Sequence, residues 1–164
     1  MSMRGLVLGV VLMAVLGSHS HASAGVDASA ELQMNVYVQP AAFIALTPST
    51  VNFFPTDPAL PTPGDNPVVC TVRIFQGTAG QSTVTAQADG DLIGTTGTIS
   101  CRNVTWHATG AGFVDGFMCY TTPQPVASFT GPGTRTGTLS FTLAAGDYAV
   151  DSYHAKAQFL LTVL

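Results

Sequence analysis

Residues Ala30–Val38 alternate strictly between apolar and polar side chains, and this alternation constrains the fold more than any other feature of the chain. One face would carry the apolar residues Ala30, Leu32, Met34, Val36 and Val38. The opposite face would carry Glu31, Gln33, Asn35 and Tyr37. A period of two is typical of a β-strand with one buried face. The pattern leaves open whether this strand enters the sheet of its own chain or the sheet of another copy.

Residues 1–24 have the three parts of a secretory signal peptide. Arg4 places a positive charge near the start, an apolar run covers Gly5–Gly17, and the segment ends in Ala22-Ser23-Ala24. As a helix the apolar run would span only about 20 Å, which is shorter than the ~30 Å hydrocarbon core of a membrane. We therefore expect a helical leader that is cleaved after Ala24. The mature chain would be exported to the periplasm, the cell surface or an extracellular filament, with no later segment inserted in a membrane.

The rest of the chain also predicts strands. Alternating or β-branched segments recur with turn signals between them, and no helical period follows the leader. The main predicted strands are Val68–Gln76, Ser82–Ala88, Thr98–Ala108, Phe113–Thr122, Gly137–Leu143 and Tyr153–Leu164. We predict an all-β fold: a single antiparallel β-sandwich domain of about seven to nine strands over residues 25–164. The Pro- and Gly-rich stretches Pro55–Pro67 and Pro123–Gly133 are expected to be exposed connections.

Charge is sparse in this sequence. Five Lys and Arg and nine Asp and Glu make up 9% of the residues, far below the usual quarter of a soluble domain. Without a basic cluster, nucleic acid and anionic membranes are poor partners. A surface rich in Thr and Ser carries few charges to oppose contact between sheet edges. This composition suits a protein that is surrounded by neighbouring subunits, and it also suits a stable secreted domain.

Three cysteines follow the leader: Cys70, Cys101 and Cys119. In an oxidising compartment a disulfide is the default interpretation of a close pair. Cys101 and Cys119 lie at equal distances on either side of Gly110, which would place them opposite each other in a hairpin that turns at Thr109–Gly112. We expect a Cys101–Cys119 disulfide, with Cys70 either a free buried thiol or an alternative partner.

No catalytic, cofactor-binding or metal-binding motif stands out. His107 and His154 are the only histidines after the leader, and neither has a ligand at a zinc-site spacing. The acidic turn Asp89-Gly90-Asp91 could hold calcium, but Asp and Gly are also common turn residues. The single Trp106 could stack on a sugar or fill the core, and the core is the expected place. We expect no enzyme activity and no cofactor.

Three segments give the chain a resemblance to bacterial secreted Ig-like sandwich subunits related to fimbrial (pilin) and spore-coat-U-type proteins. The first is the alternating strand directly after the leader. The second is Leu46-Thr47-Pro48-Ser49-Thr50-Val51-Asn52-Phe53, which is similar to a step those proteins often carry. The third is the closing pair Gly137–Leu143 and Tyr153–Leu164.

The resemblance implies an Ig-like or pilin-like sandwich and a structural role. In such fibres the N-terminal strand of one subunit completes the sheet of the next. Ala30–Val38 would be that strand here, and its five apolar residues would make the contact. The partners would be further copies of the chain or related filament subunits, with a periplasmic assembly factor as a further candidate. The alternative is a monomeric periplasmic or cell-surface adhesion module that presents Pro55–Pro67 and Pro123–Gly133 to a protein or glycan.

Overall fold

The computed structural model of the protein describes residues 30–164. The chain divides into two units, residues 1–35 and Val36–Leu164, and all the strands belong to the second. The predicted leader, residues 1–24, lies outside the described residues. Within residues 30–164 no helix is both long and apolar enough to cross a membrane.

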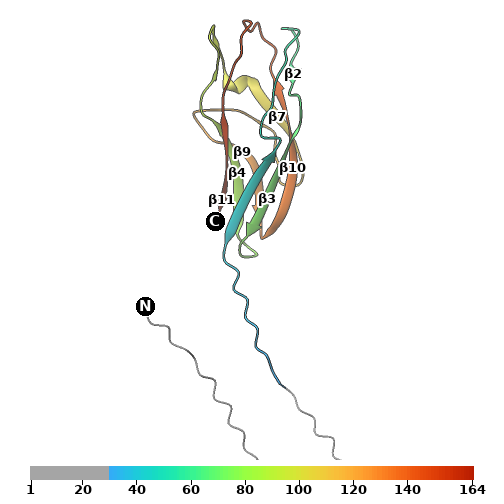
Figure 1. The fold of residues 1–164 in the computed structure, drawn as a ribbon, viewed down its shortest axis with the longest axis vertical. Coiled ribbons are helices and arrows are strands. Elements are labelled where there is room, and N and C mark those ends of the chain that lie inside the picture. The colour runs from blue at the N-terminus through green and yellow to red at the C-terminus, as the bar shows by residue number, and fades with distance from the viewer. Residues whose placement is uncertain (1–29) are drawn as a thin grey trace, which may run out of the picture. The chain divides into compact units, whose positions relative to one another are not determined.

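The described residues form eleven strands and one short 3-10 helix, and they contain no α-helix. The elements are β1 Ala41–Thr47, β2 Thr62–Pro63, β3 Val68–Phe75, β4 Gln81–Ala88, β5 Leu92–Ile93, β6 Thr98–Ile99, η1 Cys101–Asn103, β7 Val104–Thr109, β8 Gly116–Phe117, β9 Gln124–Thr130, β10 Gly133–Leu143 and β11 Ala157–Val163. The largest antiparallel sheet has the order β1-β3-β10-β7-β8, with β2 also paired to β10 (Figure 1). A second sheet has the order β11-β4-β9, and β5 pairs with β6. The all-β prediction is confirmed.

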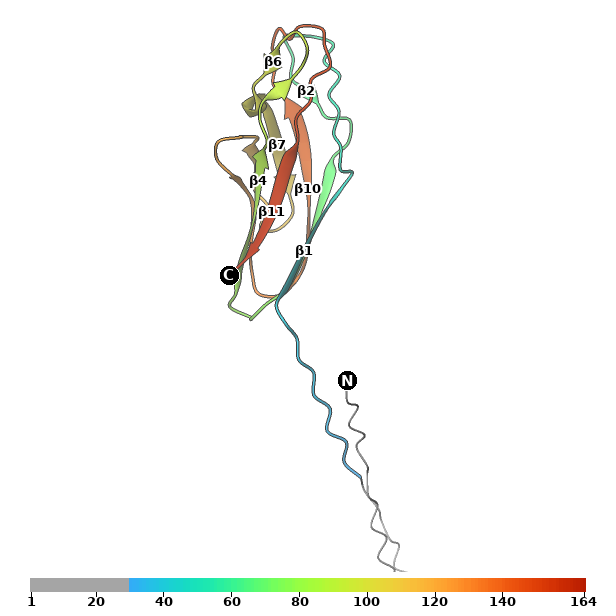
Figure 2. The same ribbon diagram turned by 60° about the vertical axis from the view of Figure 1, so that its left-hand side comes forward.

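The two larger sheets face each other across one hydrophobic core (Figure 2). Alternation in sequence determines which side chains enter the core. Val68, Cys70, Val72 and Ile74 of β3 are buried, as are the alternate residues of β4 from Ser82 to Ala88. Trp106 of β7 is also buried and packs at a tilt against Phe141 of β10, with ring centroids 6.2 Å apart. This is the arrangement of an antiparallel β-sandwich.

The turn between β7 and β8 lies where the sequence places it. Gly110 and Gly112 have φ angles of 114° and 84°, which are conformations that residues with a Cβ rarely adopt. Thr105 pairs with Phe117 and Trp106 with Gly116, so the register is centred on Ala111 rather than Gly110. Cys101 and Cys119 are therefore not directly opposite each other, although they lie at the same end of the hairpin.

The structure corrects the strand predicted at Ala30–Val38. Residues 30–40 form no strand, and the first strand within the described residues is β1. The interpretation of Ala30–Val38 as the first strand of its own sandwich is therefore wrong. The alternation predicts which side chains would share a face of an extended segment, but it cannot supply the neighbouring strand that a sheet requires.

Four other segments differ from the prediction. Pro123–Gly133 is mostly strand β9 rather than a loop, because Pro125 lies on an edge strand where the register with β4 shifts, and such positions tolerate proline. The predicted strand Thr98–Ala108 is interrupted by η1, where the Ser100 side chain accepts a hydrogen bond from the Arg102 backbone. The predicted strands Phe113–Thr122 and Tyr153–Leu164 are shortened to β8 and β11.

Candidate functional site

A large cavity opens at the end of the sandwich where β1 ends and β11 begins. Its volume is about 1240 Å³. The inner part is mostly apolar and is contributed by both large sheets. These residues include Leu46, Val68, Ala88, Val104, Met118, Phe141, Leu143 and Phe159. The cavity therefore extends from the hydrophobic core toward the loops.

Two loop segments, residues 48–58 and 146–156, form the walls of the cavity, and hydrogen bonds fix their positions. The Gly146 backbone N–H donates to the Pro58 carbonyl at 2.9 Å, which joins the two walls. On the second wall, the Asp151 carboxylate accepts hydrogen bonds from both the backbone N–H and the hydroxyl of Thr96. These bonds hold the pKa of Asp151 well below its usual range, with the Thr96 backbone as the largest cause. These hydrogen bonds hold the two walls in place, and the space between the walls remains open.

The edge strands β1 and β11 lie next to each other beside this cavity. Each pairs on one side only, β1 with β3 and β11 with β4. Their inward side chains are only partly buried. These residues are Ile44, Leu46, Phe159, Leu161 and Val163. The inward residues of the central strands β3 and β4 are fully buried by comparison. The core is therefore less completely covered along the seam between β1 and β11, and both strands have unpaired backbone groups there.

The apolar residues predicted to mediate self-assembly are exposed. Leu32, Met34, Val36 and Val38 have exposed fractions of 82%, 81%, 85% and 71%. Ala30, the fifth residue of the predicted set, is exposed too. Solvent-exposed apolar side chains in such a regular series are unusual in a monomer. Burying each of the larger ones would contribute about 1.5–3 kcal/mol of free energy.

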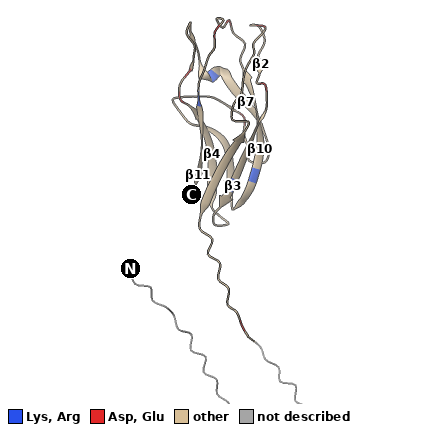
Figure 3. Cartoon of the chain, in the orientation of Figure 1, with Lys and Arg blue, Asp and Glu red and all other residues tan. Residues whose placement is uncertain are grey.

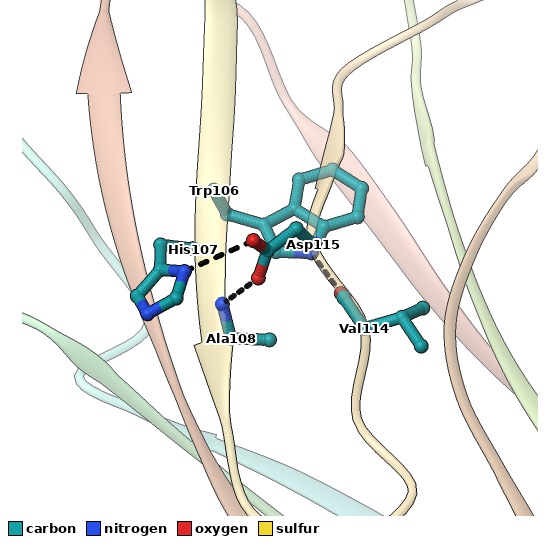
Figure 4. A network of polar contacts seen from close by, with 5 residues as sticks. All are labelled: Trp106, His107, Ala108, Val114 and Asp115. Carbon is teal, nitrogen blue, oxygen red and sulfur yellow. Dashed lines mark hydrogen bonds and ion pairs between the residues drawn. The ribbon is translucent and has the colours of Figure 1, made fainter.

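A second polar cluster lies on β7 and the turn that follows (Figure 4). The Asp115 carboxylate accepts a hydrogen bond from the Ala108 backbone N–H at 2.7 Å and lies 3.0 Å from His107 Nδ1. The pKa of Asp115 is lowered mainly by the Ala108 bond. The Trp106 indole N–H donates to the Val114 carbonyl at 2.9 Å on the inner side of the strand. This cluster closes the hairpin, and its His107 and Asp115 side chains are largely exposed.

The other candidate residues are dispersed or have structural roles. Trp106 is in the core, as predicted, so it forms no sugar-stacking surface with Tyr120. The carboxylate of Asp91 accepts a hydrogen bond from the Cys101 backbone, as expected of a turn residue. The His107 side chain faces solvent, whereas Cys101 and Cys119 are buried. Within residues 30–164 no three His, Cys, Asp or Glu side chains gather as they would around a metal ion.

Figure 3 shows how thinly charge is spread over the described residues. The cations after residue 30 are Arg73, Arg102, Arg135 and Lys156. Two of the arginines lie over aromatic rings: Arg73 over Phe43 at 5.7 Å and Arg102 over Phe117 at 5.6 Å. Such contacts stabilise the surface locally. They provide no basic groove.

Sequence reasoning did not find the cavity. Its walls come from loops that are distant in sequence, and its inner residues alternate along strands like any other core residues. The only signal was the proline-rich stretch Pro55–Pro67, which predicted an exposed connection without showing that Pro55–Pro58 would line a cavity.

Comparison with known proteins adds no relative to this description: no protein-family model, no curated protein and no solved structure matches the chain.

Proposed function

We propose that this chain is an exported, non-enzymatic structural subunit of a surface filament, pilus or coat. A signal peptide of residues 1–24 would direct its export, and the sandwich would be of the Ig-like or pilin-like kind. Copies would self-associate when residues 30–38 of one copy add as a β-strand to the sandwich of another copy.

The exposed alternating segment is the observation that carries this proposal. Leu32, Met34, Val36 and Val38 share one face of an extended chain and are each more than two thirds exposed. A strand with an unsatisfied apolar face gains free energy when another sheet covers that face. The intervening Gln33, Asn35 and Tyr37 are polar and would remain at the surface after docking.

The seam between β1 and β11 supplies an acceptor of matching chemistry. Both strands have an unpaired edge that can form main-chain hydrogen bonds. The partly buried side chains along the seam and the apolar interior of the cavity could cover alternate side chains of an added strand. Nine extended residues span about 30 Å and the seven residues of β11 about 24 Å. The donated segment is therefore long enough to follow the whole edge.

Deletion of Gly25–Gln39 tests the proposal. Light scattering and negative-stain microscopy on the full chain should show filaments or ladders whose size grows with concentration. The truncated chain should be a folded monomer, because residues 30–39 contain no strand, and added Ala30–Val38 peptide should bind to it. A full chain that stays monomeric at every concentration would refute the proposal. So would a truncated chain that loses its circular-dichroism signal, because the deleted segment would then belong to its own core.

The cavity favours a second candidate function, a monomeric binding module. Its volume of about 1240 Å³ and its apolar interior would accept a small apolar ligand or an apolar peptide end. Pro55–Pro58 of the predicted presenting loop line the cavity, whereas Pro123–Gly133 does not. A monomeric full chain that binds an apolar fluorescent probe, with the signal lost after Met118→Lys inside the cavity, would support this alternative.

A further inference from the structure

We propose that Cys101 and Cys119 are joined by a disulfide that forms through attack of the Cys119 thiolate on an external disulfide, and that Cys70 remains a free thiol. This inference is independent of strand donation. All three cysteines are unpaired and buried in this structure.

The sheet register places Cys70 out of reach of the other two cysteines. Cys70 pairs with Gly137 of β10, whereas Leu143 at the end of β10 pairs with Val104. Six residues of strand separate these two levels, which is about 20 Å along the sheet. A disulfide requires Cα atoms less than about 7 Å apart. Cys70 therefore cannot be the alternative partner that the sequence left open.

Cys101 and Cys119 are both at the Val104 end of the sheet. The Met118 backbone N–H donates to the Val104 carbonyl at 2.8 Å, and Cys119 follows directly. Cys101 begins the 3-10 helix that leads into Val104. The charge of Cys119 acts on Cys101 and contributes to raising the pKa of the Cys101 thiol, after the larger effects of burial and of Asp91. Both cysteines therefore lie at the same end of the sheet, next to residues that are hydrogen-bonded to each other.

The surroundings of the two thiols are unequal. Cys119 Sγ lies 3.2 Å from the Thr121 hydroxyl and 3.8 Å from Arg102 Nη2. The Thr121 hydroxyl, followed by backbone N–H groups and the Arg102 charge, lowers the pKa of Cys119 to about 7. Arg102 and Thr121 are themselves exposed, so this thiol lies directly beneath surface side chains. Cys119 is thus the thiol that ionises first.

The reaction balances as a two-step exchange. The Cys119 thiolate attacks one sulfur of an external disulfide, forms a mixed disulfide and releases one external thiolate. Cys101 then loses its proton and attacks Cys119 Sγ, which releases the second external thiolate. The two electrons and two protons lost by the cysteines leave as two external thiols. The Cys101–Cys119 disulfide would also restrain the cavity, whose lining includes Cys101 and Met118.

Peptide mapping of the full chain tests the pairing. The reduced chain is treated with oxidised glutathione, quenched with acid, unfolded, alkylated and digested. One linked pair of peptides, Cys101 with Cys119, and an alkylated Cys70 are expected. A Cys70→Ser chain should give the same link and no alkylated cysteine. A link to Cys70, or three alkylated cysteines, would overturn the proposal.

Matched single-thiol chains, in which Cys70→Ser is combined with either Cys101→Ser or Cys119→Ser, test which cysteine attacks. At pH 7 a thiol with a pKa near 7 is about half ionised and one with a pKa of 9 about one hundredth ionised. The thiol with the lower pKa therefore has roughly fifty times more thiolate. Its thiolate is a weaker nucleophile, which reduces the expected rate advantage to about sixfold. Cys101→Ser should therefore form its glutathione adduct at Cys119 at least about fivefold faster than Cys119→Ser forms it at Cys101. Equal rates, or faster reaction at Cys101, would overturn the assignment of Cys119, and circular dichroism confirms that both variants are folded.

Discussion

One substitution separates strand donation from every other use of residues 30–38: Val36→Asp compared with Asn35→Asp. Both changes add one negative charge to adjacent exposed positions, and neither residue belongs to a strand of its own chain. The stability of the isolated sandwich should therefore be unchanged in both variants. Only Val36 lies on the apolar face that would be buried in a neighbouring copy.

The magnitude follows from the exposure of Val36. Its side chain is 85% exposed, so nearly all of the burial free energy, about 1.5–3 kcal/mol, is available on docking. Aspartate at this position forfeits that gain and adds the cost of removing a carboxylate from water. At about 1.4 kcal/mol for each factor of ten, the concentration needed for half-assembly should rise at least about tenfold. Asn35→Asp should change it by less than about threefold.

Sedimentation velocity over a dilution series measures this concentration for the wild type and both variants. Repeating the series at high salt removes long-range repulsion between subunits, which is screened, while the loss of apolar burial remains. The reasoning is refuted if Val36→Asp assembles like the wild type. It is also refuted if both variants lose assembly equally, because the two faces of the segment would then be equivalent.

Three further predictions concern the sandwich itself. Trp106→Phe removes the 2.9 Å hydrogen bond to a backbone carbonyl and should lower the free energy of unfolding by about 1–3 kcal/mol in urea titrations; an unchanged midpoint would contradict the role assigned to the indole N–H. Gly137→Ala adds a Cβ that would overlap the Phe113 ring, so thermal denaturation should show a loss of about 1–3 kcal/mol, and a stability equal to the wild type would show that the ring can move aside. The pKa of Asp115 is lowered chiefly by the Ala108 N–H, so its stabilisation is complete above the unfolded value near 3.9 and is lost as the pH falls through the lower folded value. Asp115→Asn should therefore flatten the pH dependence of stability below pH 4, and an identical acid slope in variant and wild type would exclude this contribution.

The sequence pattern is sufficient to predict the strands that pair with a neighbouring strand along both edges. In β3 and β4 the alternation of apolar and polar residues is strong, and each residue faces the side that the pattern predicts. Trp106 was expected in the core and is there, because a large ring with a single polar N–H is best accommodated where a backbone carbonyl can accept its proton. Local chemistry also predicted the turn at Gly110 and Gly112.

The sequence pattern failed where the outcome depends on a neighbour. Ala30–Val38 has the clearest alternation in the chain, yet it forms no strand, because strand formation needs a partner edge that the pattern does not encode. The sequence predicts that Pro125 belongs to a loop. In the structure it lies in the edge strand β9, where the register with β4 shifts. The cavity could not be predicted for the same reason: it depends on how far apart the folded loops are held, and the composition of each loop does not contain that distance.

The point at which residues 36–40 join the sandwich determines which assembly strand donation would produce. Residues 36–40 lead directly into the Ala41 end of β1 (Figure 1), whereas Leu46 and Pro48, on either side of its Thr47 end, line the cavity. Donor and acceptor are thus different surfaces, so one contact leaves a free donor and a free acceptor, and growth can continue. A closed dimer would require two sandwiches side by side, with residues 30–38 of each copy turning back along the other copy. Pro40 opposes such a turn because it restricts Gln39 to extended conformations. The scattering mass should therefore keep rising with concentration, and a plateau at two copies would show reciprocal exchange instead of a filament.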